Sequence, residues 1–433
     1  MIWRALSIES TGAGLSSKRQ RLERFLFLIS EWVFSVGGNV VAELFSGLRT
    51  PVRIIRNAGY ALGILTGFTC IGMPNARADE FLDQIVGFNG EILFVEHEVP
   101  ALVIGAIRNG ETSIAGFGER VDGSGLPPDG STLMRIGSIT KTFTGEVLAH
   151  LTANNKVQLT QPLVKSWPEI ATAVDPNVKQ IRLIDLVTHS GGLPREVPVP
   201  PGPYNDPYRN ITIPAFTNWL KTETLLYKPG RSVMYSNFGF DLLAHGLSLA
   251  TAEPYPALLE RFITEPLAMK DTSFAPTNAQ KRRLMQGHDF DGKAMPDVPT
   301  GDVIVGSGGL YSTPNDLLRW MQWHLNRFGK AGAETRSLDH ALYLVRDGLD
   351  TVSGMDESGE MDAMGLAWVA MMPEGNRPFI LQKAGGLQGT FTYIAFAPAR
   401  GVAVFVAINQ FDVAAATDMA QVANNLIATL APR

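Results

Sequence analysis

The sequence predicts an α/β (α+β) fold, in which one antiparallel sheet built from both ends of a domain is flanked by helices and carries an inserted helical region. Two observations support this prediction. Hairpins of β-prone residues lie near the two ends of residues 79–433, and helical periods dominate about 140–300. The 433-residue chain is 45% hydrophobic and 18% charged, which is typical of a globular protein with a sizeable core.

The first predicted hairpin follows a proline at the start of the domain. Two β-prone runs, 101–108 (ALVIGAIR) and 111–120 (ETSIAGFGER), are joined by Asn109-Gly110. This dipeptide favours the type I′ turn that connects neighbouring antiparallel strands. We therefore expect two paired strands here.

The second predicted hairpin lies near the C-terminus. Residues 390–398 (TFTYIAFAP) and 401–409 (GVAVFVAIN) flank an Ala399-Arg400 turn, and residues 412–431 have helical spacing. Strands from the two ends, closed by a helix, predict a single sheet that unites both ends of the domain.

Between the hairpins, helical periods alternate with loops rich in proline and glycine. The predicted helices are residues 141–155, 211–223, 240–251 and 314–328. The segment 193–208 (LPREVPVPPGPYNDPY) has too many prolines for a helix or a strand. We expect it to be a loop at the rim of a site or a lid over it.

An export signal is predicted at residues 48–78. A basic flank precedes the apolar run 58–73, and an A-x-A cleavage pattern ends at Ala78. Cleavage there would produce a mature chain that begins at Asp79 and lacks Cys70, the single cysteine of the sequence. The expected location is the bacterial periplasm or the medium outside the cell.

Residues 1–47 precede this signal, and we interpret them as an extension of doubtful status, such as a start codon assigned too early would produce. The alternative is a membrane-associated helix at the apolar segment 25–45, which would add peripheral membrane association. Glu31 and Glu43 disfavour a helix that spans the bilayer.

Composition and motifs disfavour several classes of function. The net charge of −5 and the pI near 5.9 provide no positive field for nucleic acid. The seven histidines include no H-x-H or H-E-x-x-H grouping, which disfavours a zinc hydrolase, and no G-x-S-x-G is present, which disfavours an α/β-hydrolase. We expect no metal and no other cofactor in the reaction.

Ser138 is the candidate nucleophile. Ser138-Ile139-Thr140-Lys141 is the only Ser-x-x-Lys of the chain, and it lies where a loop turns into a helix. At this spacing the two side chains share one face of the helix, so the amine of Lys141 can take the hydroxyl proton if its pKa is lowered by burial and a second cation. The positive end of the helix dipole favours the oxyanion that forms when Oγ attacks a carbonyl.

A second element, Tyr235-Ser236-Asn237, follows a Pro-Gly turn and precedes a predicted helix. The hydroxyl of Tyr235 can relay a proton between Ser138 and a leaving group. The amide of Asn237 can hold an amide carbonyl of the substrate.

The third element is Lys383-Ala384-Gly385-Gly386, which precedes the strand predicted from residue 390. A lysine at a sheet edge supplies the second cation. The N–H of Gly386 can complete an oxyanion hole with the N–H of Ser138.

Two other motifs have simpler interpretations. His189, in THSGGLP, offers an alternative Ser-His pair, but it precedes a glycine turn, so it is expected to fix a loop by hydrogen bonding. Residues 306–309 (GSGG) are not followed by Lys-Ser/Thr, so they predict a turn near the floor of the site and not a phosphate loop.

The three elements together resemble those of the serine β-lactamase and penicillin-binding protein superfamily, and the tyrosine element is similar to that of its class C branch. The resemblance extends over nearly all of residues 79–433 and is closest to the periplasmic D-alanyl-D-alanine carboxypeptidase/endopeptidase group. It implies an acyl-serine intermediate, with peptidoglycan peptides or β-lactams as the expected partners. It says nothing of the oligomeric state.

One departure from the family leaves the substrate open. The third element is usually Lys-Thr-Gly, and Ala384 replaces its threonine. The loss of one hydroxyl bond to a substrate carboxylate costs about 1.5–3 kcal/mol of recognition. The alternatives to a DD-peptidase are therefore a class C-type β-lactamase, a short-chain esterase of the same fold, and a non-catalytic penicillin-fold binding protein.

Overall fold

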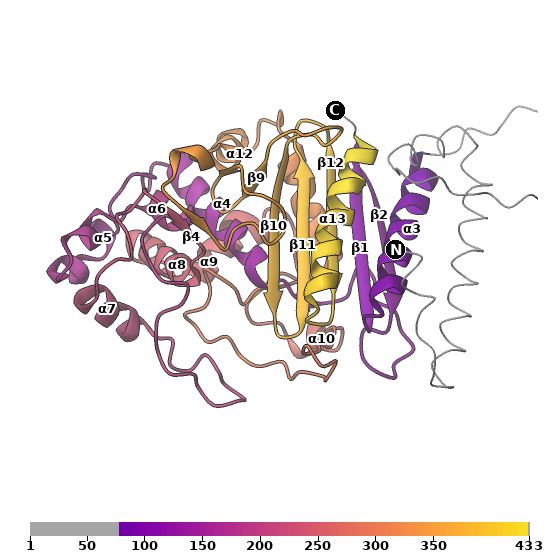
Figure 1. Ribbon diagram of the computed structural model, residues 1–433, viewed down its shortest axis with the longest axis horizontal. Helices are drawn as coiled ribbons and strands as arrows, with labels where there is room; N and C mark the ends of the chain where they lie inside the picture. Colours follow the sequence, from indigo (N-terminus) through magenta and orange to yellow (C-terminus); the bar gives the residue numbers. More distant parts are fainter. Residues whose placement is uncertain (1–77, 432–433) are drawn as a thin grey trace, which may run out of the picture. The chain divides into compact units, whose positions relative to one another are not determined.

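An eight-stranded antiparallel sheet forms the middle layer of residues 78–431, the part of the chain that the computed structural model describes (Figure 1). The bounds of its strands are β1 Ala101–Arg108, β2 Glu111–Gly118, β6 Leu344–Val345, β8 Ala363–Met364, β9 Val369–Met371, β10 Ile380–Leu387, β11 Thr390–Ala397 and β12 Val402–Ile408. In space they lie in the order β2-β1-β12-β11-β10-β9-β8-β6.

The two hairpins unite both ends of the domain, as predicted. β1 pairs with β12, with Leu102 opposite Ile408, and their hairpin partners β2 and β11 extend the sheet on either side. Asn109 and Gly110 both have positive φ values, 53° and 88°, as a type I′ turn requires. The predicted fold class is confirmed.

Four helices cover the two faces of the sheet, and their bounds are α3 Ala78–His97, α4 Thr140–Ala153, α11 Pro314–Leu325 and α13 Val413–Leu430. Successive strand residues point to opposite faces, and both faces are buried. In β1, Leu102 lies in the core beneath α3 and α13, whereas Val103 lies in the core that α4 and α11 share. The result is a three-layer arrangement with the sheet in the middle (Figure 1).

The helical region supplies further helices and two short sheets. The further helices are α5 Leu163–Ser166, α6 Leu183–Val187, α7 Ile213–Thr222, α8 Asn237–Thr251, α9 Tyr255–Leu259, α10 Asn278–Lys281 and α12 Ala333–His340. The short sheets pair β3 Met134–Arg135 with β5 Tyr311–Ser312, and β4 Val233–Met234 with β7 Val352–Ser353.

The four helices predicted in this region correspond to α4, α7, α8 and α11, with ends that move by at most a few residues. Three of them start at a capping hydroxyl: Thr212, Ser236 and Thr313 each accept a hydrogen bond from the N–H three residues later. The segment 193–208 contains no helix or strand, as its prolines predicted.

The predictions for the N-terminal part, the extension 1–47, the signal up to Ala78 and the cysteine Cys70, lie outside the described residues, except that α3 begins at Ala78. Within the described residues, no helix combines the length and the apolarity needed to cross a membrane.

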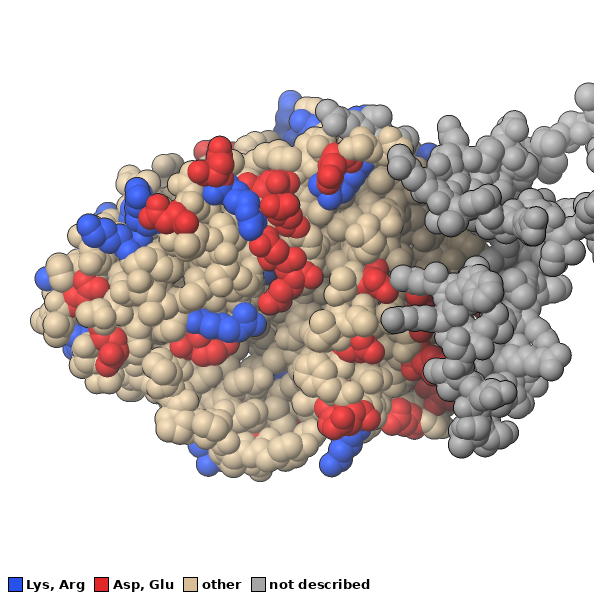
Figure 2. Space-filling model, viewed as in Figure 1, with Lys and Arg blue, Asp and Glu red and all other residues tan. Residues whose placement is uncertain are grey.

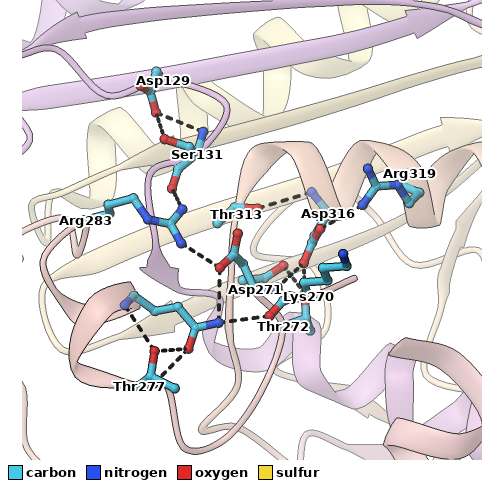
Figure 3. Close-up of polar contacts among 12 residues, drawn as sticks. Asp129, Ser131, Lys270, Asp271, Thr272, Thr277, Arg283, Thr313, Asp316 and Arg319 are labelled. Atoms are coloured by element: carbon cyan, nitrogen blue, oxygen red, sulfur yellow. Dashed lines mark hydrogen bonds and ion pairs between the residues drawn. The ribbon is translucent and has the colours of Figure 1, made fainter. Parts of the chain in front are cut away.

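A polar network fixes the loop before α10 and the start of α11 (Figure 3). The Asp271 carboxylate accepts a hydrogen bond of 2.6 Å from Arg283, which also donates to the Ser131 carbonyl. The Asp316 carboxylate accepts from the Asp271 N–H at 2.8 Å and from the Thr272 hydroxyl at 3.0 Å. The loop is therefore tied both to α11 and to the segment that leads into β3.

Replacement of Asp316 tests this network. We expect Asp316→Ala to lower the free energy of unfolding by about 1–3 kcal/mol, because the buried Thr272 hydroxyl and the Asp271 N–H lose an acceptor. Denaturation in guanidinium chloride measures the change. The control Asp347→Ala removes an exposed carboxylate and should stay within about 0.5 kcal/mol of wild type; equal effects of the two replacements would contradict the assignment.

Candidate active site

Ser138 lies in a 3₁₀ turn, Gly137–Ile139, that leads directly into α4. Its Oγ is 3.0 Å from the Lys141 Nζ and 2.6 Å from the Tyr235 hydroxyl. Two of the partners that the sequence predicted therefore reach the nucleophile itself. Since Lys141 is three positions further along, the start of α4 places both groups on one side of the chain.

Lys141 is fully buried, and its ammonium has three hydrogen-bond acceptors. Besides the Ser138 Oγ, these are the Asn237 Oδ1 and the Ser307 carbonyl, each at 2.6 Å. Burial lowers the pKa of Lys141 below its ordinary value, although the carboxylate of Asp241 opposes the shift. The neutral amine that a general base requires is therefore more accessible than in a solvent-exposed lysine.

Asp241 is a functional residue that the sequence analysis missed. Its carboxylate accepts hydrogen bonds from the N–H groups of Gly306 and Ser307, at 3.1 and 2.9 Å, and from the Ser307 hydroxyl at 2.9 Å. These bonds fix the Ser307 carbonyl against Lys141. Residues 306–309 therefore form the floor of the site, where the sequence placed them.

Tyr235 follows β4, and its ring is surrounded by cations and one imidazole. The Nζ atoms of Lys141 and Lys383 lie 4.9 and 4.8 Å from the ring centroid, and the Arg195 guanidinium lies at 4.6 Å. The His189 ring stacks on it with the centroids 4.6 Å apart. Positive charges beside a phenol favour the transient phenolate that a proton relay would form.

His189 holds the tyrosine element in place. Its Nδ1 accepts a 2.9 Å hydrogen bond from the Ser236 N–H, and its carbonyl accepts from the Met234 N–H at 3.0 Å. Burial, with the charges of Lys383 and Lys141, lowers the pKa of His189 well below its ordinary value, so the ring is neutral. The geometry matches loop fixing, the role expected from the sequence.

Asn237 opens α8 next to Lys141, and both ends of its amide are engaged. Oδ1 accepts from Lys141, and Nδ2 donates to the Glu196 carboxylate. The Arg195 carbonyl accepts from the Asn237 N–H at 2.8 Å, so the proline-rich loop is anchored at the start of α8. Arg195 and Glu196, which the sequence analysis also missed, therefore lie at the rim of the site. A substrate carbonyl would have to displace Glu196 to reach Nδ2.

Lys383 to Gly386 lie inside β10, an inner strand of the sheet, and not in a segment before the first C-terminal strand. The register of β9 on β10 covers only Ile380 to Gln382. From Lys383 onward, this side of β10 is open and contacts the turn that carries Ser138. Lys383 therefore lies at a local sheet edge, as the sequence predicted. The sheet itself continues beyond β10, because β9 pairs with the earlier residues of this strand.

Two glycines allow β10 and the 3₁₀ turn to touch. Gly137 has φ 51°, and a Cβ there would lie 2.5 Å from the Gly386 N. A Cβ on Gly385 would lie 2.2 Å from the Ile136 carbonyl oxygen and 3.0 Å from the Ser138 N. The backbone amides of Ser138 and Gly386 therefore meet across a contact with no room for side chains, and this is where the predicted oxyanion hole is needed.

A recess of about 510 Å³ opens beside these groups, and the space-filling view shows the face hollowed near its centre with acidic side chains gathered alongside (Figure 2). Ser138, Tyr235 and Lys383 line it on one side. Ala384 faces the recess from the other side of β10, beside an apolar wall that includes Phe290, Phe391, Phe411 and Met419. The wall could accept an uncharged part of a substrate but offers little to a carboxylate.

Comparisons with known proteins agree with this geometry. The pattern of the β-lactamase family matches residues 77–427. The chain is 35% identical over 352 residues to the D-alanyl-D-alanine-carboxypeptidase/endopeptidase AmpH of Escherichia coli (strain K12). This match covers 81% of the chain and 90% of that protein. It is 23% identical over 346 residues to a β-lactamase of Pseudomonas fluorescens, over 76% of this chain and 93% of that protein.

Solved structures give the same result. A β-lactamase/D-alanine carboxypeptidase from Yersinia pestis, complexed with citrate, matches with a TM-score of 0.71 and 35% identity over 81% of this chain and 98% of that one. A class C β-lactamase matches with a TM-score of 0.69 and 18% identity over 83% and 99%, which shows a shared fold. The chain therefore belongs to the β-lactamase family and is a serine hydrolase of the β-lactamase/DD-peptidase type.

Proposed function

We propose that this protein is a D-alanyl-D-alanine carboxypeptidase/endopeptidase that cleaves peptidoglycan peptides through an acyl-serine intermediate. The observation that supports this most is the Ser138 Oγ, which lies within hydrogen-bond distance of both the Lys141 amine and the Tyr235 hydroxyl. The AmpH similarity at 35% identity supports the substrate class.

In acylation, the substrate carbonyl oxygen lies between the N–H groups of Ser138 and Gly386. Neutral Lys141 takes the proton from the Ser138 Oγ, which attacks the carbonyl carbon, and the two amides stabilise the resulting oxyanion. Tyr235 then donates its proton to the leaving amine as the C–N bond breaks, and Lys141 passes its extra proton to the Tyr235 phenolate, so that both groups return to their neutral forms.

In deacylation, a water molecule attacks the acyl-enzyme from the recess. The neutral amine of Lys141 first takes the phenol proton of Tyr235 and later passes it to the departing Ser138 Oγ. In between, the Tyr235 phenolate, flanked by Lys141 and Lys383, takes a proton from the attacking water. The two lysines balance the negative charge that Tyr235 carries at that moment.

Ala384 favours substrates that lack a terminal carboxylate at this position. Where the family has a threonine hydroxyl, this chain has a methyl group beside an apolar wall. Lys383 still supplies a positive charge, so carboxypeptidase activity is retained. The rate of cleavage of cross-linked peptides should nevertheless be higher relative to the carboxypeptidase rate than in family members with the threonine. A β-lactamase or an esterase of this fold would use the same nucleophile and would differ in the assays below.

The place of action follows from the substrate. The predicted signal at residues 48–78 supports export, and we expect the mature chain to begin at Asp79. N-terminal sequencing of the protein from a bacterial host measures this directly; an exported protein that begins within residues 1–47 would contradict it.

Covalent labelling tests the nucleophile and the acyl-enzyme. A fluorescent penicillin should label the wild-type protein, and the Ser138→Ala variant should show no label in denaturing gels, because no Oγ is present to form the ester. Ser131→Ala, at a serine outside the site, is the matched control and should label like wild type. An unlabelled wild-type protein would support a non-catalytic binding protein. Fast nitrocefin turnover without muropeptide cleavage would support a β-lactamase.

The rate of labelling should depend on pH through Lys141. Only the neutral amine accepts the serine proton, so the acylation rate should rise as pH increases through the lowered pKa, with a midpoint well below 10.5, the ordinary lysine value. Lys141→Ala should lose about 10²–10⁴-fold in rate and lose this dependence. The control Lys165→Ala removes an exposed lysine and should keep both. A wild-type midpoint at 10.5 would exclude the proposed base.

Restoring the family threonine tests the role of Ala384. We expect Ala384→Thr to raise carboxypeptidase activity on a pentapeptide with a free C-terminus about tenfold relative to cleavage of a cross-linked muropeptide, because it adds one hydroxyl bond to a carboxylate. Ala384→Val has a similar shape without the hydroxyl and should leave the ratio unchanged. An equal change in both variants would mean that shape, and not the hydroxyl, sets the preference.

A further inference from the structure

A second cluster of polar side chains lies where the ends of α11 and α12 meet. It consists of His324 in the last turn of α11 and of Asp339 and His340 at the end of α12. None of these residues lines the recess at Ser138, and the proposed reaction uses none of them. His324 and Asp339 are completely buried, and the His340 side chain is 14% exposed.

The three side chains point their donor atoms at one another. The His324 Nδ1 lies 2.9 Å from the His340 Nε2 and 3.7 Å from the Asp339 Oδ2, and the His340 Nε2 lies 3.9 Å from the same oxygen. A point equidistant from these atoms is about 2.1 Å from each, which is the length of Zn–N and Zn–O bonds. Tetrahedral geometry would require the two imidazole nitrogens to separate by about 0.4 Å and the Asp339 oxygen to approach them by about 0.3–0.6 Å.

Three buried polar atoms in the cluster and beside it have no hydrogen-bond partner. The Asp339 Oδ1, the His324 Nε2 and the Glu146 Oε1 are buried without a hydrogen bond. Arg336, which lies nearby on α12, donates to the Gly329 carbonyl and lies over the Trp323 ring, so it does not pair with Asp339 in the described contacts. A buried carboxylate without a cation is costly, and a bound divalent ion would remove that cost.

The surroundings of the cluster are typical of a metal site. The Trp368 indole N–H donates to the Asp339 Oδ2 at 2.8 Å, and the Glu146 carboxylate lies 3.6 Å from the His324 Nε2, the nitrogen that faces away from the cluster. The Trp320 indole in turn fixes Glu146 with a 2.6 Å hydrogen bond. Metal-binding histidines usually present their other nitrogen to such a carboxylate.

We propose that His324, Asp339 and His340 bind one divalent transition-metal ion, with Zn²⁺ the best match, in a site that joins the ends of α11 and α12. Two imidazoles and one carboxylate are typical zinc ligands, whereas Mg²⁺ and Ca²⁺ prefer oxygen. Water entering on the partly exposed side of His340 would supply the fourth ligand. The site is separate from the acyl-serine chemistry and stabilises the fold.

Metal content and spectroscopy test the site directly. The protein purified from zinc-supplemented medium without chelators should contain one equivalent of Zn²⁺ by mass spectrometry. After removal of the metal, Co²⁺ should produce the visible bands of a four-coordinate site. Zn²⁺ at a hundredfold excess over its Kd should raise the melting temperature by roughly 3–4 °C.

A matched pair of variants distinguishes this site from surface binding. His97, with Glu96 and Asp418, forms a partly exposed group that could also hold an ion. His340→Gln should lose the Zn²⁺ equivalent and the Co²⁺ bands and should weaken binding at least a hundredfold, whereas His97→Gln should keep all three. Circular dichroism confirms that each variant is folded, and Asp339→Asn replaces His340→Gln if the latter does not fold.

Several outcomes would overturn the proposal. These are a wild-type protein that takes up no Zn²⁺ and shows no thermal shift, an octahedral Co²⁺ spectrum typical of a surface ion, or loss of the metal in His97→Gln but not in His340→Gln. In any of these cases His324 and His340 form a hydrogen-bonded pair and no metal site.

Discussion

The contact between the turn before α4 and strand β10 is the constraint on which the site depends. The backbones of the turn and the strand touch directly there, because side chains at Gly137 and Gly385 would overlap the opposing chain. The Thr392 hydroxyl on β11 donates to the Ile136 carbonyl at 3.0 Å and holds the turn from the other side. This contact brings the amide of a helix start next to the amide of a strand edge, two groups that no single element could place together.

The charges around this contact come from elements far apart in the sequence. Lys141 from α4, Lys383 from β10 and Arg195 from the proline-rich loop all face the Tyr235 ring, while Asp241 and Glu196 supply the opposing charge. Burial alone would favour neutral lysines, and the carboxylates limit that effect. Such a balance is typical of catalytic sites, where groups must exchange protons near neutral pH.

The sequence predicted the parts of the fold and the site that local patterns determine. The Asn109-Gly110 turn, the four helices of the helical region and the first two motifs are local, and the structure has them where the sequence placed them, whereas the third motif lies inside β10. Helix α3 is not among the elements predicted from the sequence, although Leu82, Val86 and Leu93 have helical spacing. The catalytic roles of these groups remain predictions.

What the sequence could not supply are partners set by tertiary packing. Asp241 lies in an ordinary amphipathic helix, and its role appears only when residues 306–309 pack against it. Glu196 is one charge in a proline-rich loop. The His324 cluster combines residues whose spacing in the sequence matches no metal motif, because two helices, and not one segment, bring them together.

The pairing of β1 with β12 also constrains how the protein is made. The Ala101 N–H donates to the Asn409 side chain, 308 positions away in sequence. The hairpin of β1 and β2 therefore leaves the ribosome with one edge unpaired and waits for nearly the whole chain before its neighbour exists. Closing so long a loop is slow, and an open strand edge is prone to aggregation. A sheet that takes its central strands from opposite ends of the domain therefore leaves an aggregation-prone edge exposed until the last strand is made.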